Sequence, residues 1–521
     1  MADYTSLNDR EGKFSRFLRF RNTKPDTDYT DPEKNLPLEL KRTNSVWQKR
    51  AEQMEINTLA VTGGREYVDA RLSRFSGESN IDWEGGVRAD GGRVDGRKQQ
   101  SHCFPYPARI TDKISQHVFS DRPERDTIAD YILNDASADG CSLDELMRKA
   151  NDYVTSCGWC WLGVDSPTIE GQVSRADKVA KKIRPYIQVY SPLEVVDWKF
   201  NAIGELDWLI TESDETSSTL PEEPEACYKV RRIWTRGAVR IVRMEVTDKG
   251  EKIIVSDEES VIGYSGVPFV LVGSISAGGH AFDDIESVNR TIMDLESVNR
   301  ANFYKRCFPQ MVLPNSCISN VSDAFSSAGL DAAELIVGLN YPILVSKDDP
   351  MPMYLMPAAA DMGALRSELQ QLKHNMFEAV GLMLQSESRQ VASAESKAWD
   401  YLDVSMVMKA RAAVLEDAEN KAAKIIHEWD GGVPEWTAVY NRHFDIGDFE
   451  QEMNALITAV NTSMPAEMYR LILHKILDRI DRLGSSVTPE ERKVIEDAIN
   501  GFSPNTLSIG VQEDFGAPEP T

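Results

Sequence analysis

The chain has 521 residues and a formal net charge of −25, with 41% hydrophobic residues. At about 150 residues per domain, this length indicates two to four domains with real cores. The negative net charge argues against a protein that binds nucleic acid with high affinity, because such domains are usually strongly basic. It does not exclude a protein that lets DNA pass, because like-charged walls repel phosphate.

The seven cysteines are scattered and odd in number, which predicts a reducing compartment without a disulfide framework. No apolar run reaches about 18 residues, so no membrane span is expected. The first residues lack the apolar core of a signal peptide. These features together predict assembly and use in a cytoplasm.

Residues 1–44 form a polar, highly charged arm. Basic residues surround four apolar ones in its middle, as in Lys13, Phe14, Arg16, Phe17, Leu18, Arg19, Phe20, Arg21 and Lys24. Two interpretations remain open, a solvated arm and an arm that docks on a partner.

The next 238 residues (45–282) mix helical and strand patterns. Helices are expected over residues 45–59, 110–119, 127–134 and 142–156, and residues 77–96 form a glycine-rich surface loop. Ser142 and Glu145 have the spacing of a capping box, which opens the last of these helices. Strands are expected over residues 159–165, 184–190, 195–198, 206–211, 227–234, 239–246, 253–256 and 267–272. Alternation within residues 227–256 is typical of an antiparallel meander.

A helical period starts at residue 283, where Ile285, Val288, Ile292 and Leu295 share one face. This helix ends before Pro309. Between it and the next helix lies a compact insert of residues 310–360. The insert is predicted to contain a strand (311–313), a short helix (321–328) and a second strand (343–346).

The most informative pattern covers residues 363–429, which predict a helix to residue 380, a short polar loop and one very long helix. No Gly or Pro occurs from Leu382 to Asp430. One stripe with spacings of four and three runs along the long helix: Ala394, Ala398, Tyr401, Ser405, Met408, Ala412, Leu415, Glu419, Ala422, Ile426 and Trp429. A helix over residues 393–429 would be about 55 Å long. Such a rod spans a domain, packs against copies of itself or lines a channel.

Gly431, Gly432 and Pro434 end the long helix, and the remainder is mostly helical. Helices are expected over residues 448–462, 465–483 and 488–500. The last one has Pro489 at its first position. A loose acidic tail follows.

Motifs for catalysis or metal binding are weak. Cys157 and Cys160 have the CxxC spacing, but a helix precedes them and a strand follows, the reverse of a thioredoxin-like site. No second pair completes a zinc site, so buried structural thiols are the better interpretation. Residues 135–146 begin like a calcium loop, yet Leu146 stands where a bidentate Glu is required, which favours a turn between two helices.

The glycines of residues 85–96 lack the Gly-Lys-Ser/Thr of a phosphate-binding loop, and neither HExxH nor GxSxG occurs. No acid/base pair is identifiable. We therefore expect no catalytic residue, no metal and no cofactor, and a protein that is not an enzyme. A basic cluster is interpreted as a solvated loop, with contact to DNA or an acidic partner as the alternative: Arg175, Lys178, Lys181, Lys182 and Arg184.

The order of these regions resembles the portal proteins of tailed bacteriophages, the head–tail connectors. Several short stretches support the resemblance, namely residues 139–143, 158–167, 184–186, 191–198, 267–269 and 284–285, with Pro309 after the helix. It covers residues 45–500. It implies an α+β multidomain fold with an α/β wing containing antiparallel strands, a helical stem, a small α/β clip, a long central helix and a helical crown.

The domains that the resemblance implies follow the chain. They are an N-terminal arm (1–44), wing (45–282), first stem helix (283–308), clip (309–360), second stem helix (361–384), tunnel loop (385–392), long helix (393–430), crown (431–505) and flexible acidic tail (506–521). The tunnel loop would project into a DNA channel through Gln385, Ser386, Glu387, Ser388, Arg389 and Gln390. It contains neither Gly nor Pro, so a helical continuation stays open.

By the same resemblance, subunits form a ring of twelve at the portal vertex of the capsid, assembled in the host bacterial cytoplasm. Double-stranded DNA would pass through it non-specifically during packaging and ejection. Terminase, the major capsid protein and a head–tail adaptor would be partners, with no membrane. Small side chains suit close helix packing, so the long helix is expected to contact other subunits through Ala398, Tyr401, Met408, Ala412, Leu415 and Ala422.

The alternative is a structural or scaffold protein of virion assembly without a channel. The insert between two helices argues against it, since a plain scaffold needs no such module.

Overall fold

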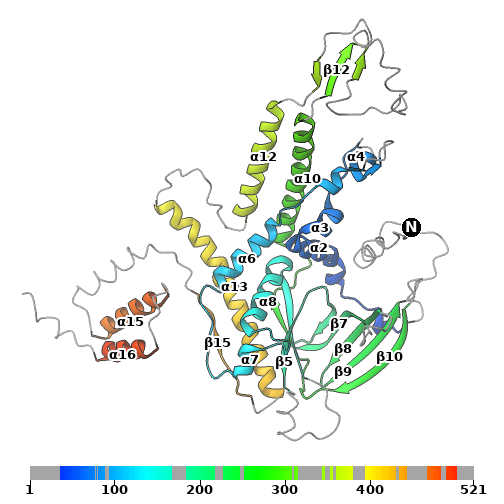
Figure 1. Ribbon diagram of the computed structural model, residues 1–521. Coiled ribbons are helices and arrows are strands. Elements are labelled where there is room, and N and C mark those ends of the chain that lie inside the picture. The colour runs from blue at the N-terminus through cyan, green and yellow to red at the C-terminus, as the bar shows by residue number, and fades with distance from the viewer. Residues whose placement is uncertain are drawn as a thin grey trace, which may run out of the picture.

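The computed structural model has an α+β fold in which helices and antiparallel sheets share cores (Figure 1). It describes residues 36–76, 78, 80–87, 93–166, 184–216, 227–246, 252–307, 310–314, 343–345, 353–355, 359–379, 394–429, 433–442, 466–482 and 489–501. The helices that precede α10 are η1 (Leu38–Leu40), α2 (Ser45–Thr62), α3 (Gly64–Arg71), α4 (Asn80–Glu84), α5 (Arg97–Gln100), α6 (Tyr106–Val118), α7 (Asp130–Asn134) and α8 (Leu143–Cys157). Those that follow are α10 (Ala281–Cys307), α12 (Ala359–Glu378), α13 (Ala394–Trp429), α15 (Ala466–Arg482) and α16 (Pro489–Asn500).

A five-stranded antiparallel meander forms the larger sheet, in the order β10-β9-β8-β7-β6. Its strands are β6 (Val195–Phe200), β7 (Leu206–Thr216), β8 (Cys227–Thr235), β9 (Ala238–Val246) and β10 (Lys252–Val261). The predicted meander is confirmed, and β10 extends five residues beyond the predicted end at residue 256. One face of this sheet carries Trp234, which belongs to an apolar cluster with Trp159 and Trp161.

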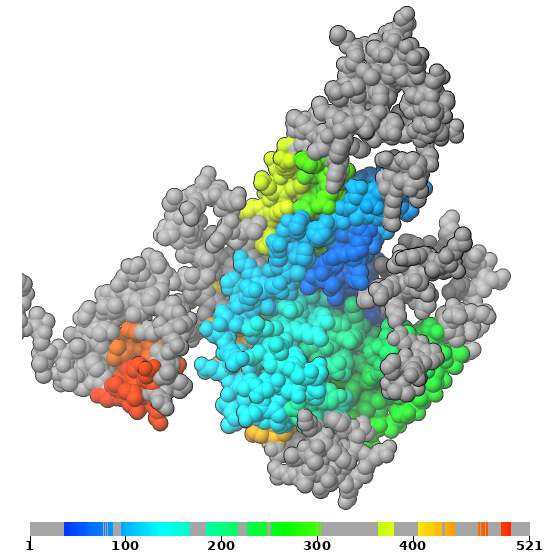
Figure 2. All heavy atoms as spheres, viewed as in Figure 1, coloured from blue at the N-terminus to red at the C-terminus, as the bar shows by residue number. Residues whose placement is uncertain are grey.

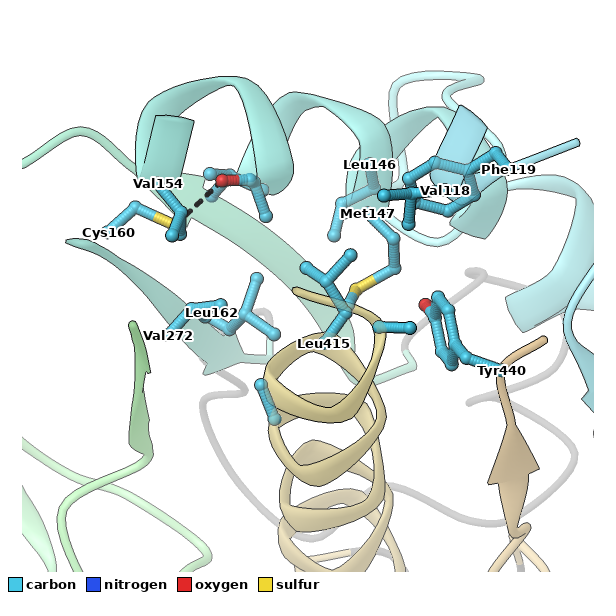
Figure 3. Packing of buried hydrophobic residues seen from close by; sticks show 14 of the residues in the cluster. Val118, Phe119, Leu146, Met147, Val154, Cys160, Leu162, Val272, Leu415 and Tyr440 are labelled. Carbon is cyan, nitrogen blue, oxygen red and sulfur yellow. Dashed lines mark hydrogen bonds between the residues drawn. The ribbon is translucent and has the colours of Figure 1, made fainter. Parts of the chain in front are cut away.

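A second antiparallel sheet has the order β11-β4-β5 and forms the centre of the main core. Its strands are β4 (Trp159–Asp165), β5 (Tyr186–Tyr190) and β11 (Phe269–Gly273). The predicted bounds of β4 are confirmed residue for residue. Figure 3 shows the apolar side chains of α8, β4 and α13 meeting here, with Leu162 and Leu415 between the elements.

The predicted capping box is present at the start of α8. The Ser142 hydroxyl accepts from the Glu145 amide at 3.3 Å, and the Glu145 carboxylate accepts from the Ser142 amide at 3.0 Å. The helix ends at Gly158, which adopts φ 97° as its left-handed cap. Local sequence therefore sets both ends of this core helix.

The α10 and α12 helices form a pair that extends away from the sheets and leads to a small sheet (Figure 1). That sheet contains β12 (Gln310–Pro314), parallel to β13 (Ile343–Val345) and antiparallel to β14 (Met353–Leu355). Two of its strands are confirmed predictions, and the third, β14, is an addition. The predicted short helix at residues 321–328 lies outside the described residues.

Residues 77–96 differ from the predicted surface loop. They contain α4 and a hairpin of β1 (Gly85–Val87) and β2 (Arg93–Asp95). Glycine-rich composition hid this hairpin, because its strands carry few of the β-branched residues that favour strands. A second short pairing joins β3 (Glu124–Arg125) to β15 (Ala438–Val439).

The α15 and α16 helices confirm the helices predicted for residues 465–483 and 488–500. The two helices pack against each other. The predicted helix at residues 448–462 lies outside the described residues. None of the described helices combines the length and apolar character needed to cross a membrane. Figure 2 shows the described residues from the first helices to the meander as one continuous surface, coloured from blue to green.

Candidate functional site

The first candidate element is α10, whose polar face is buried against the N-terminal helices. At its start, Asp283 accepts from both terminal nitrogens of Arg50, at 2.5 and 3.1 Å, and from Asn57 at 2.9 Å. Its carboxylate also accepts from the His280 amide at 2.8 Å. Burial disfavours the charged form, but these hydrogen bonds outweigh it and lower the pKa of Asp283.

One turn further along α10, Glu286 is 1% exposed and ionically paired. Arg71 donates to its two oxygens at 2.9 and 3.2 Å, and the Tyr67 hydroxyl donates at 3.0 Å. Burial, together with the negative charge of Glu286, raises the pKa of Tyr67 far above its usual range. The tyrosine therefore stays a hydrogen-bond donor.

The same face continues toward the end of α10. Asp294 accepts from the Ser73 amide at 2.9 Å, and Ser297 accepts from Arg97 at 2.7 Å. Residues at positions 283, 286, 290, 294 and 297 share one side of a helix. This stripe fixes α10 to α2, α3 and α5, so any force on α10 reaches the body of the molecule directly.

The α12 helix packs along α10 through apolar side chains, and a charged contact and an aromatic neighbour add to this packing. Lys373 donates to Glu296 at 2.8 Å and lies 5.1 Å from the centre of the Tyr106 ring. Tyr106 in turn meets Phe377 edge to face, with ring centres 6.5 Å apart. These contacts hold the two rods side by side and join them to α6.

The third element, α13, has the predicted stripe, but the stripe faces inward. Met408, Ala412, Leu415 and Ala422 are 0–1% exposed and belong to the main core. Fully buried side chains have no surface for another subunit. The interface predicted through these four residues is therefore corrected: their small and apolar side chains pack α13 against β4 and β11 of the same chain.

Glu419 lies in that buried stripe and is 0% exposed. Arg125 donates to its two oxygens at 2.6 and 3.1 Å, Tyr440 donates at 2.7 Å and Trp436 at 3.2 Å. Arg125 also donates to Asp144 at 2.6 Å. The cluster joins α13 to β3, α8 and the segment around β15, and every charge in it has a partner.

The opposite face of α13 is exposed and changes character along the helix. Met406 and Val407 are 58% and 45% exposed, and Ala410 is also exposed. Two turns later, Lys421 and Asp417 form an exposed ion pair at 2.6 Å. Apolar surface is therefore concentrated in the first half of the described outer face.

The remaining predicted site residues belong to the start of α13 and to the predicted tunnel loop. Ala398 and Tyr401 belong to α13, and their side chains are outside the described part of the chain. Gln385, Ser386, Glu387, Ser388, Arg389 and Gln390 lie outside the described residues altogether. The tunnel-loop assignment stays a prediction.

The weaker motifs occupy structural positions. Cys157 and Cys160 are buried free thiols, and burial raises the pKa of each. The segment before α8 is a turn, in which Asp135 accepts from the Gly140 amide at 2.7 Å. Within the described ranges no group of three potential ligands has the geometry of a metal site.

Of the predicted basic cluster only Arg184 is described, and its side chain is 19% exposed. It pairs with Asp135, donates to the Tyr131 carbonyl at 3.0 Å and stacks over the Tyr131 ring.

Sequence reasoning missed the buried polar face of α10. The signal was present, because Asp283, Glu286, Asp294 and Ser297 follow a helical period beside the recognised apolar stripe. Charged residues on a helix usually indicate its solvated side, so the pattern suggested the wrong environment. Their arginine partners precede α10 by about 200 residues, a separation that no local pattern spans.

No protein-family model and no curated protein matches the chain. Among solved structures, it is similar to the neck of the native GTA particle computed with C12 symmetry (11% identity, TM-score 0.37, covering 71% of this chain and 89% of that chain). It is also similar to the virion of the native gene transfer agent (GTA) particle (10%, 0.35, 71% and 89%). A third similarity is to the neck of the empty GTA particle computed with C6 symmetry (11%, 0.38, 71% and 90%). These TM-scores lie below 0.5, so the likeness carries no argument about function.

Proposed function

We propose that the chain is a portal-type protein, one subunit of a ring-shaped channel at the head–tail vertex of a virion. Double-stranded DNA would be packaged and ejected through this channel. The ring would also be the docking site for terminase and a head–tail adaptor. The activity is conduction and attachment rather than catalysis.

The observation that carries this proposal is the arrangement of α10, the small sheet and α12. Two paired helices leave the body together, and the β12–β14 sheet lies beyond their far ends (Figure 1). A plain scaffold has no use for a separate module on a two-helix stalk. A portal requires such a module, because a clip at the end of the stem can bind other proteins while the stem lines the channel.

The buried charged stripe of α10 supports the same function. Arg50, Arg71 and Arg97 hold the stalk through interactions that are partly or fully buried. Buried, hydrogen-bonded charges keep one geometry, because breaking a single partner leaves an uncompensated charge. A stalk under load from a packaging motor requires such rigidity.

Residues 385–392 connect the stalk to the long helix, and we propose that they face the DNA. They contain one cation, Arg389, and one anion, Glu387, among polar and small residues. Such a segment touches phosphate without sequence preference and without holding it. The net charge of −25 keeps other contacts with DNA few.

Ring formation requires a surface between subunits, and the exposed face of α13 is the better candidate now that the inner stripe is assigned to the core. Met406, Val407 and Ala410 present apolar surface to solvent in the single chain. We propose that this face, rather than Ala412 or Ala422, approaches the neighbouring subunit.

The test is electron microscopy of the purified full chain, combined with mass measurement in solution. The expected result is rings with a central hole. A Val407→Glu variant should fold with unchanged thermal stability and lose rings, because a charge would enter the interface. The matched Ala422→Glu variant should fail to fold instead, because its charge enters the core.

A chain that stays monomeric or dimeric under all conditions would contradict the channel. Assemblies without a hole would favour the non-channel scaffold.

A further inference from the structure

The outer edge of β10 is an unusual surface for a folded protein. β10 ends the five-stranded sheet, and within the described residues no strand pairs with its outer side. Figure 1 shows it as the outermost arrow of that sheet. Long exposed edge strands pair readily with other chains, so proteins normally shorten, charge or cover them.

The side chains of this edge fall into two groups. Ile253, Ile254 and Val255 are 52%, 39% and 52% exposed, which is a contiguous apolar run on the surface. Asp257, Glu258 and Glu259 follow and are exposed too. A ligand that covers both groups must be apolar at one part and basic at another, with an extended backbone that pairs with the edge.

The segment of residues 36–44, which precedes α2, runs across the sheet toward this edge. The Asn44 amide donates to the Val196 carbonyl of β6 at 2.9 Å, and the Arg42 carbonyl accepts from Arg231 of β8 at 3.4 Å. Further back, Leu40 packs on Val242 and Met244 of β9. The chain therefore crosses the sheet toward β10 as residue numbers fall.

Charge contacts mark the same path. Glu39 accepts from Arg240 of β9 at 2.5 Å, and Arg240 also donates to Asp257 of β10 at 2.7 and 2.8 Å. Leu36, the first described residue, still packs against the Leu40 cluster. The chain at residue 36 therefore lies over the β8–β9 part of the sheet, and β10 is one strand spacing, roughly 5 Å, beyond β9.

Residues 13–21, which we name the basic arm, have the composition that the edge requires. They contain Lys13, Arg16, Arg19 and Arg21 with four apolar residues and no acidic one. Residues 22–35 separate the arm from Leu36. These 14 residues span up to about 45 Å when extended, far more than the crossing needs.

We propose that the basic arm of the chain docks on the free edge of β10 of the same chain as an added strand. Its aromatic side chains cover Ile253, Ile254 and Val255, and its cations face Asp257, Glu258 and Glu259. This docking requires neither a ring nor DNA. Its test is therefore independent of the proposed function.

Hydrogen–deuterium exchange of the full chain tests the docking. Amides of residues 252–261 that point away from β9 should be protected, and a variant Arg16→Glu/Arg19→Glu/Arg21→Glu should exchange them at least tenfold faster. The control Lys178→Glu/Lys181→Glu/Lys182→Glu changes the charge equally in another segment and should leave β10 protected.

A charge swap makes the test specific. Adding Glu258→Lys/Glu259→Lys to the reversed arm should restore protection, because opposite charges again face each other. Unprotected amides in the wild-type chain, or equal protection in the arm variant and the wild type, would overturn the proposal.

Cross-linking identifies which copy supplies the arm. A carbodiimide should join the Lys13 amine to Glu258 or Glu259, and Lys13→Arg should abolish that product. In a mixture of ¹⁴N- and ¹⁵N-labelled chains, the expected cross-linked peptides carry one isotope only. Absence of the Lys13 product, or peptides of mixed isotope, would overturn docking within one chain.

Discussion

Glu419 is a fully buried carboxylate that four donor groups satisfy, two of them from the Arg125 guanidinium. Burying an ion pair is neutral or costly by itself, but removing one partner leaves a bare charge in the core. The residue therefore tolerates no loss of Arg125, although the pair is not a source of net stability.

An Arg125→Met variant should lose about 3–5 kcal/mol of unfolding free energy. The matched control is Arg122→Met, because Arg122 contacts the same Asp144 at 3.3 Å but its side chain is 89% exposed. An exposed pair contributes at most about 1 kcal/mol. Denaturant titration of both variants measures the difference, and equal losses would contradict this account of the cluster.

Asp152 should make stability depend on pH. Burial chiefly, with help from Asp112, raises its pKa to about 6, although the Ser115 hydroxyl donates to it at 2.5 Å and Arg148 is nearby. The unfolded value is about 3.9. Between these values the folded chain holds more protons than the unfolded chain, so this group makes stability fall as pH rises from about 4 to 6.

Asp152→Asn keeps the acceptor for Ser115 and removes the titration. Thermal melting of wild type and variant across pH 4–7 checks this. The melting temperature of the variant relative to that of the wild type should rise as pH rises. A difference that does not change with pH would contradict a raised pKa for Asp152.

At the scale of elements, α10 and α12 form one stalk because their apolar side chains, such as Ile292 and Leu369, share one core. Lys373 adds a charged contact between them beside Tyr106. A hydrogen bond between charged groups contributes about 1.5–3 kcal/mol. Both side chains are partly exposed, at 29% and 19%, so the lower end of that range applies here.

Lys373→Glu should therefore loosen α12, because it places two carboxylates in contact. Exchange of the amides of residues 363–378 should rise about tenfold, as expected for about 1.4 kcal/mol. Adding Glu296→Lys should restore slow exchange. Arg366→Glu, an exposed change on the same helix, serves as the control and should have little effect.

At the scale of the whole molecule, residues 385–392 follow α12 and precede α13 in the sequence, and we propose that they face the DNA. Deleting Gln385–Gln390 should spare ring assembly and impair DNA packaging or retention, because the segment is proposed to touch DNA rather than a neighbouring subunit. Electron microscopy and a packaging assay separate the two effects. If the deletion removes most rings but the remaining rings still package DNA, the assignment of this segment as a DNA-contacting loop is contradicted.

The sequence by itself determined those elements whose signals are local. Absence of Gly and Pro predicted the rod Ala394–Trp429 within one residue of its start, and the capping box placed the start of α8. Alternating residues predicted the meander. These features follow from contacts over one to four residues, which a local pattern contains completely.

Only the tertiary structure decided what each element faces. The stripe of Ala412 and Ala422 was visible, yet a small-residue face suits a neighbouring subunit and a chain's own sheet equally well. Arg71 finds Glu286 across 215 residues. With 58 basic and 83 acidic residues in the chain, local order cannot select such pairs. They form because folding brings one particular pair together where water is excluded and each charge needs a partner.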